Sequence, residues 1–135
     1  MTVDKKTALK VWQAAFGNVE WAVDCFGTLM NVSAYSNESV VMRRPGDNRD
    51  YDYSWNIDHI RPISNFEKES DANFMNNLEP MHRENNLEKL DNYPNFKIDG
   101  KSYKVVRTEG FYGYGIANLL GIRIDWKART HQYFE

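Results

Sequence analysis

The stretch YSWNIDHIRP (residues 53–62) is followed, after a polar loop, by NNLEPMHRENNLEKL (residues 76–90). In the first stretch, aromatic and β-branched residues alternate with polar ones, which predicts a strand that ends at Pro62. The first half of the second stretch predicts a short extended piece. Its second half (residues 81–90) predicts a helix, with Pro80 at its start. Together they predict a strand–loop–strand–helix unit.

Four polar side chains of this unit have the chemistry that phosphodiester hydrolysis needs. Asp58 and Asn86 offer hard oxygen ligands suited to Mg²⁺ or Mn²⁺. His59 follows Asp58 directly, and a histidine can accept a proton from water at neutral pH. The amide of Asn77 can fix the orientation of that imidazole or of the loop that carries it. We therefore expect a metal site at Asp58 and Asn86 and catalytic roles for His59 and Asn77.

The same residues resemble a known motif. Its parts are DHIRP (residues 58–62), NLEPMH (residues 77–82) and NNLEK (residues 85–89). This combination resembles the motif of the HNH endonuclease family, in particular small bacterial and phage members, whose core is the ββα-metal fold. The resemblance covers residues 53–94, about a third of the chain. It implies that Asp58 and Asn86 bind the metal ion, that His59 is the general base and that Asn77 is the central Asn of the motif.

One departure from the family concerns zinc. Many HNH proteins carry two Cys-x-x-Cys pairs that bind a structural zinc, whereas this chain has a single cysteine, Cys25. His82 and Asn85 stand where the second pair would be. We therefore expect no structural zinc and a core held by packing. His82 could approach the metal as an accessory residue, but a helix-capping or core position is favoured.

The resemblance implies a function and leaves one alternative open. The leading hypothesis is a metal-dependent HNH endonuclease that hydrolyses nucleic acid, with DNA as the favoured substrate. The alternative is a binding protein that keeps the HNH scaffold to engage another macromolecule, such as a phage-encoded inhibitor of a host defence complex. The intact Asp58, His59 and Asn86 favour the nuclease.

The length of 135 residues indicates a single α+β domain, residues 1–135. The HNH core would span residues 53–94, preceded by a helical and loop extension (1–52) and followed by a basic extension (96–135). In the first extension, apolar spacing predicts a helix over residues 5–16, and we expect a second short helical piece over residues 19–25. Residues 40–42 favour a strand.

The C-terminal extension contains a strong hairpin signal over residues 96–106, with Asp99-Gly100 at the turn. A further short strand or helix is expected around residues 122–126. The aromatic run at residues 111–114 could stack on bases, although core packing is favoured.

Charge is unevenly distributed along the chain. The net charge is −2, but residues 58–90 carry −3 and residues 97–135 carry +3. This asymmetry suits a cation bound by the middle segment and phosphates bound by basic residues elsewhere. Lys89 is equally consistent with a phosphate contact and with a solvated lysine. The candidate nucleic-acid-binding residues are Arg43, Arg44, Arg61, Lys89, Lys101 and Lys104.

Composition and termini bear on location. The chain is 41% apolar and contains 19 aromatic residues, which argues against a disordered protein. It has no apolar signal segment at the N-terminus and no run of 18 apolar residues, so neither secretion nor membrane contact is expected. With one cysteine, the sequence favours the cytoplasm of a bacterium or of a phage-infected host.

Overall fold

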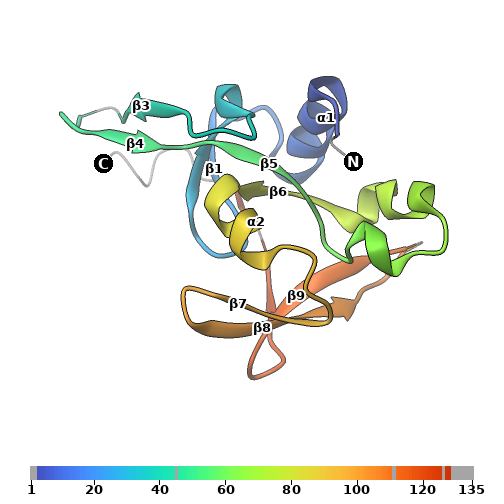
Figure 1. Ribbon diagram of the computed structural model, residues 1–135. Coiled ribbons are helices and arrows are strands. Elements are labelled where there is room, and N and C mark those ends of the chain that lie inside the picture. The colour runs from blue at the N-terminus through green and yellow to red at the C-terminus, as the bar shows by residue number, and fades with distance from the viewer. Residues whose placement is uncertain (1–2, 45, 111, 126, 129–135) are drawn as a thin grey trace.

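The computed structural model describes residues 3–44, 46–110, 112–125 and 127–128, as an α+β fold with small antiparallel sheets (Figure 1). Its two α-helices are α1 (Lys5–Phe16) and α2 (Arg83–Lys89). Its strands are β1 (Trp21–Val23), β2 (Leu29–Asn31), β3 (Val41–Arg43), β4 (Asp50–Asp52), β5 (Trp55–His59), β6 (Leu78–His82), β7 (Asn95–Ile98), β8 (Lys101–Arg107), β9 (Tyr114–Asn118), β10 (Arg123–Ile124) and β11 (Lys127–Ala128). Short 3-10 helices are η1 (Val32–Ala34), η2 (Ile63–Asn65), η3 (Glu69–Asn73) and η4 (Met75–Asn77).

The predicted strand–loop–strand–helix unit forms at β5, β6 and α2. The two strands pair antiparallel from Trp55 opposite His82 to His59 opposite Leu78, and α2 begins directly after β6. The prediction that Pro80 starts the helix is wrong. Pro80 lies within β6, opposite Ile57, because the strand pairing continues to His82. A proline is tolerated there because each strand of a two-stranded sheet is an edge strand.

One core cluster lies between α1 and the β5–β6 pair. The predicted helix over residues 5–16 is confirmed: Asp4 caps its first turn, and Trp12 and Phe16 are among its buried residues. The Trp12 ring lies 4.8 Å from the Trp55 ring, centroid to centroid. This packing fixes one face of β5.

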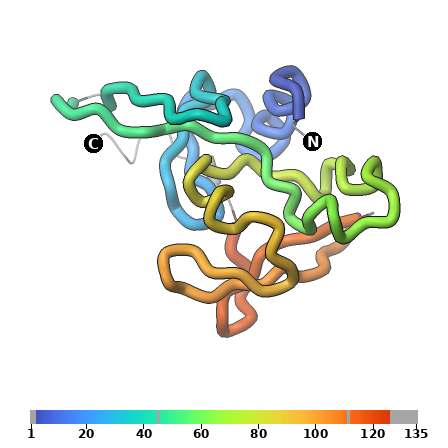
Figure 2. The backbone as a smooth tube through the Cα atoms, in the orientation of Figure 1, coloured from blue at the N-terminus to red at the C-terminus, as the bar shows by residue number. Residues whose placement is uncertain are grey.

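A second core cluster fixes the other side of the unit. A four-stranded sheet in the order β10-β9-β8-β7 buries Phe96, Val105 and Ile116 against Ile60 and Met81. Figure 2 shows the chain beyond α2 folding beneath the β5–β6–α2 unit. The unit is therefore supported from both sides.

The hairpin predicted near the C-terminus is confirmed at β7 and β8. Asp99 (φ 51°) and Gly100 (φ 76°) lie at its turn, with the positive φ angles that a primed turn requires. The later element is the strand β10. Tyr114 of the aromatic run is buried, whereas Phe111 lies outside the described residues.

The N-terminal predictions are only partly correct. The strand predicted at residues 40–42 corresponds to β3. The helical piece predicted over residues 19–25 is wrong, because Trp21–Val23 is the strand β1. All three of its residues are buried, and it pairs with β2 on one side and β11 on the other. Neither helix of the described part is long and apolar enough to cross a membrane.

Candidate functional site

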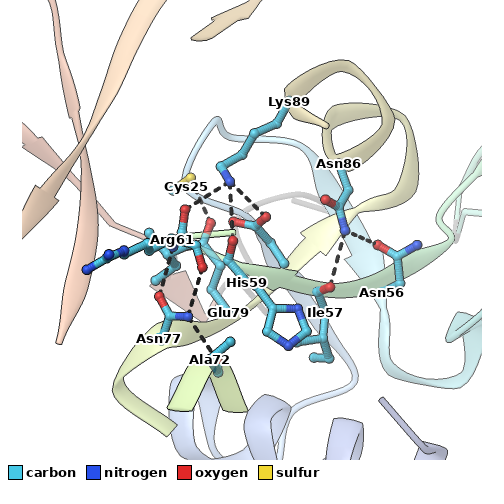
Figure 3. Close-up of polar contacts among 12 residues, drawn as sticks. Cys25, Asn56, Ile57, His59, Arg61, Ala72, Asn77, Glu79, Asn86 and Lys89 are labelled. Atoms are coloured by element: carbon cyan, nitrogen blue, oxygen red, sulfur yellow. Dashed lines mark hydrogen bonds and ion pairs between the residues drawn. The ribbon is translucent and has the colours of Figure 1, made fainter. Parts of the chain in front are cut away.

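Strand alternation sorts the site residues onto two faces of β5. Asn56 and Asp58 contact side chains of α2, whereas His59 contacts Asn73 at the end of η3. In Figure 3, Lys89 and Asn86 reach β5 from one side, and the imidazole of His59 points to the other. The structure therefore places Asp58 beneath α2 and His59 on the opposite face.

Asp58 forms a buried ion pair with Lys89. Asp58 is 2% exposed and Lys89 is 0% exposed. Lys89 Nζ lies 3.1 Å from Asp58 Oδ1 and also donates to the carbonyl oxygens of Ile60 (3.0 Å) and His59 (3.4 Å). Asp58 Oδ2 is buried and accepts no hydrogen bond from the described residues. One oxygen of the carboxylate is thus held, and the other has no partner in the described part of the chain.

Asn86 joins α2 to β5. Its Nδ2 donates to Asn56 Oδ1 at 2.6 Å and to the carbonyl oxygen of Ile57 at 3.3 Å. No hydrogen bond from the described residues reaches its Oδ1. Asn86 therefore uses its amide nitrogen to position the helix and keeps its oxygen available.

Two oxygens beside β5 have the ligand chemistry that a hard divalent cation prefers. Asp58 Oδ2 is a buried carboxylate oxygen without a partner among the described residues, and Asn86 offers an amide oxygen on the same side of β5. Mg²⁺ is commonly held by one or two protein oxygens and completes its shell with water. Within the described residues, no group of three or more His, Cys, Asp or Glu side chains could hold a metal ion. The ligand set would be one carboxylate and one amide.

Glu79 is a buried acid beside the site that sequence reasoning missed. It lies opposite Asp58 in the β5–β6 register and is 1% exposed. Cys25 Sγ donates to its Oε1 at 3.5 Å, while Oε2 has no partner among the described residues. Burial, together with the nearby charge of Asp58, raises the pKa of Glu79 well above its ordinary value. Strand register could have identified Glu79, because pairing β5 with β6 places residues 58 and 79 on the same face of the sheet.

His59 is half-buried, and its ring is oriented by one hydrogen bond. Its Nε2 lies 2.7 Å from Asn73 Oδ1. An amide oxygen can only accept, so Nε2 donates this hydrogen bond, and in the neutral imidazole Nδ1 has the lone pair. The imidazole therefore has one nitrogen available to accept a proton.

Asn77 organises the loop after β5. It is fully buried, and its Oδ1 accepts from the Arg61 backbone N–H at 2.8 Å. Its Nδ2 donates to the carbonyl oxygens of Arg61 (3.0 Å) and Ala72 (2.9 Å). The sequence suggested that this amide orients either the imidazole of His59 or the loop that carries it. All three of its hydrogen bonds go to the loop, and none goes to the imidazole.

Asp24 joins the turn at residues 24–28 to the start of α2. Its Oδ1 accepts from the backbone N–H groups of Phe26 and Thr28, both at 3.0 Å. Its Oδ2 accepts from the His82 backbone N–H (3.0 Å) and from Asn85 Nδ2 (2.8 Å). Sequence reasoning expected packing alone here and missed this carboxylate. The sequence does not reveal these hydrogen bonds, because Asp24 is about 60 residues away from His82 and Asn85 along the chain.

Both ring nitrogens of His82 are engaged. Nδ1 accepts from the backbone N–H of Glu84 at 3.1 Å, which makes His82 the N-cap of α2. Nε2 lies 2.8 Å from the carbonyl oxygen of Asp52. The capping interpretation is confirmed, and in this arrangement neither nitrogen can reach a metal ion as an accessory ligand.

Most of the candidate phosphate-binding residues are engaged within the protein. Lys89 is buried against Asp58, so its ammonium cannot reach a phosphate in this arrangement. Arg61 donates to Tyr114 Oη and to the Asn65 carbonyl oxygen, both at 2.6 Å, and its guanidinium lies over the Phe66 ring.

The remaining four candidates lie on two surface hairpins. Arg43 pairs with Asp50 (3.7 Å) and Arg44 with Asp47 (2.8 Å). Lys101 and Lys104 are exposed on β8, and neither forms an ion pair with a described residue. The lysines of β8 are therefore the candidates best placed to meet a phosphate backbone.

Comparisons with known proteins add nothing to this geometry. No protein-family model, curated protein or solved structure matches the chain. The function is therefore inferred from the site itself.

Proposed function

We propose that this protein is a metal-dependent endonuclease of the HNH type that hydrolyses phosphodiester bonds, with DNA as the favoured substrate. One observation carries the proposal. β5, β6 and α2 follow one another as in a ββα-metal core, and Asp58 and Asn86 each keep an oxygen without a partner among the described residues, on the side where the helix meets the strand.

Each site residue has a role in this proposal. Asp58 and Asn86 hold Mg²⁺ or Mn²⁺, which when bound neutralises charge on the phosphate and on the leaving oxygen. His59 accepts the proton of the attacking water through Nδ1, while Asn73 fixes the ring. Asn77 holds the loop that follows His59, and so sets where that loop lies.

The test is metal-dependent nicking of supercoiled plasmid DNA together with metal titration. We expect cleavage by the purified protein with Mg²⁺ or Mn²⁺ and none with excess chelator. In titration calorimetry, Asp58→Ala and Asn86→Ala should each weaken Mn²⁺ binding, because each removes one of two protein oxygens. Asn48→Ala, which changes an exposed asparagine of the β3–β4 loop, is the matched control and should leave the affinity unchanged. Unchanged affinity in both site variants would place the cation elsewhere.

Binding to DNA should depend on the exposed lysines of the β7–β8 hairpin. Lys97, Lys101 and Lys104 are exposed, and none forms an ion pair with a described residue. Changing all three to glutamine should weaken binding to unrelated duplexes about equally. It should also flatten the log–log salt dependence by roughly 0.9 for each phosphate that these lysines neutralise in the wild-type complex.

A matched control removes the same charge from the opposite end of the fold. Lys5, Lys6 and Lys10 of α1 are also exposed. Their triple glutamine variant should keep the wild-type salt slope. If both triple variants change the slope equally, the effect is one of net charge and the hairpin makes no specific contact.

One observation favours the second candidate function, a binding protein built on the HNH scaffold, such as a phage-encoded inhibitor of a host defence complex. The ammonium of Lys89 already neutralises Asp58 without any added cation. Under this alternative, the purified protein would bind its macromolecular partner equally well in Mn²⁺ and in chelator, and would not nick plasmid under either condition.

A further inference from the structure

The ammonium of Lys89 sits in a cage of oxygens. Its three N–H groups meet three acceptors: Asp58 Oδ1 and the carbonyl oxygens of His59 and Ile60. The Phe96 ring lies 5.4 Å from Nζ, on the sheet that closes the cage. The three oxygens around this buried ammonium therefore form a site that suits a cation.

The charges around this ammonium do not balance. Asp58 and Glu79 face each other across β5 and β6, and each has a buried oxygen without a partner among the described residues. One ammonium therefore faces two carboxyl groups. An unpaired buried carboxylate is costly, so this arrangement favours an additional positive charge beside the two acids.

We propose that Lys89 is a built-in counter-cation that competes with a divalent cation for Asp58 and so sets the metal affinity of the site. The inference rests on the proposed function, which makes Asp58 a metal ligand. A cation bound by Asp58 Oδ2 would lie on the same carboxylate as the ammonium held at Oδ1, and the two like charges would repel each other in the poorly screening interior. Metal binding would then be weaker than Asp58 and Asn86 alone would give, and Asp58 stays neutralised when metal is scarce.

The experiment compares Mn²⁺ binding by wild type and by Lys89→Met, in which an apolar chain of similar length replaces the ammonium. Titration calorimetry should show Mn²⁺ binding at least tenfold tighter in the variant. Without metal, its melting temperature should fall below that of wild type, and Mn²⁺ should raise it by more than it raises the wild-type value. Lys68→Met makes the same change of net charge at an exposed position and should bind Mn²⁺ as wild type does.

Adding Asp58→Asn to Lys89→Met should abolish the gain in affinity, because the gain is assigned to that carboxylate. Equal or weaker Mn²⁺ binding in a folded Lys89→Met protein would overturn the proposal. If that variant is unfolded, Lys89→Gln is examined with and without Mn²⁺. A cooperative melt that appears only with Mn²⁺ supports the proposal, and failure of both variants to fold at saturating Mn²⁺ refutes it.

Plasmid nicking measured in parallel separates this inference from the proposed function. Cleavage by wild type with no gain in affinity on losing Lys89 would refute the inference alone. Tighter Mn²⁺ binding by Lys89→Met, with no cleavage by any protein, would refute the nuclease and leave the counter-cation role in place.

Discussion

Replacing His59 by alanine is expected to lower metal-dependent plasmid cleavage about 10²–10⁴-fold, the usual cost of losing one general base. The imidazole is half-buried and is held by its hydrogen bond to Asn73, so its removal should leave the fold intact. It faces away from α2 and from Asp58, so Mn²⁺ affinity should also stay close to wild type. Cleavage rates at saturating Mn²⁺ measure the catalytic loss. Calorimetry and circular dichroism on the same preparations measure Mn²⁺ affinity and the fold.

Asn73→Ala is the matched control for this prediction. It removes the acceptor at Nε2 but leaves the imidazole, so the base is present and only its orientation relaxes. We expect a smaller loss of rate than in His59→Ala. A His59→Ala protein that cleaves within a few-fold of wild type would remove His59 from the mechanism, and an equally large loss in both variants would show that orientation is the main contribution.

The part of the site that could be predicted from the sequence is the part that local pattern determines. Alternation over residues 53–60 specifies a strand, and helix-forming residues after Met81 specify a helix. In the structure, the antiparallel pairing of β5 with β6 joins these two stretches across the intervening residues 60–77. Asp58 and Asn86 accordingly lie on the strand and on the helix where the sequence predicts them.

Pairings across the fold could not be predicted in this way. Lys89 follows Asn86 by three residues on a short polar helix, and a lysine in such a place is usually solvated. It is buried because its ammonium reaches Asp58 on β5 and lies over the Phe96 ring of β7. Glu79 shares this difficulty, since alternation alone does not show that its face of β6 is covered by other elements.

The strand at residues 21–23 illustrates the same limit. The sequence between Gly17 and Gly27 has enough apolar residues for one turn of helix, and local propensity offers no reason to reject it. Pairing with β2 and β11 determines the outcome, because both edges of β1 then find hydrogen-bond partners. Tertiary pairing overrides weak helix propensity in a segment this short.

Replacing Asp24 by alanine should destabilise the protein by about 3–5 kcal/mol, because several buried donors lose their acceptor at about 1–3 kcal/mol each. The carboxylate is 1% exposed and accepts four hydrogen bonds that join the turn at residues 24–28 to the start of α2. Burial raises the pKa of Asp24, and its hydrogen bonds act in the opposite direction. The alanine variant would leave four donors without their acceptor. Urea denaturation measures the loss of stability.

Asp24→Asn separates hydrogen bonding from charge. Its one amide oxygen can accept two of the four bonds, so its loss of stability should lie between those of wild type and alanine. Asp91→Ala removes an exposed carboxylate just beyond α2 and should change the free energy of unfolding by less than about 0.5 kcal/mol. Equal stability of Asp24→Ala and Asp91→Ala would show that the network contributes nothing.

The same variants bear on zinc. The network joins Asp24 to His82 and Asn85. Under the proposed HNH assignment these two residues stand where many HNH proteins have metal-binding cysteines, so the carboxylate would take the structural role of zinc. Zinc added to metal-free wild type should therefore leave the melting temperature unchanged, while Asp24→Ala lowers it with or without zinc. A fall in the wild-type value on chelation, reversed by zinc and not by magnesium, would contradict this assignment and show that a metal ion shares the role given to Asp24.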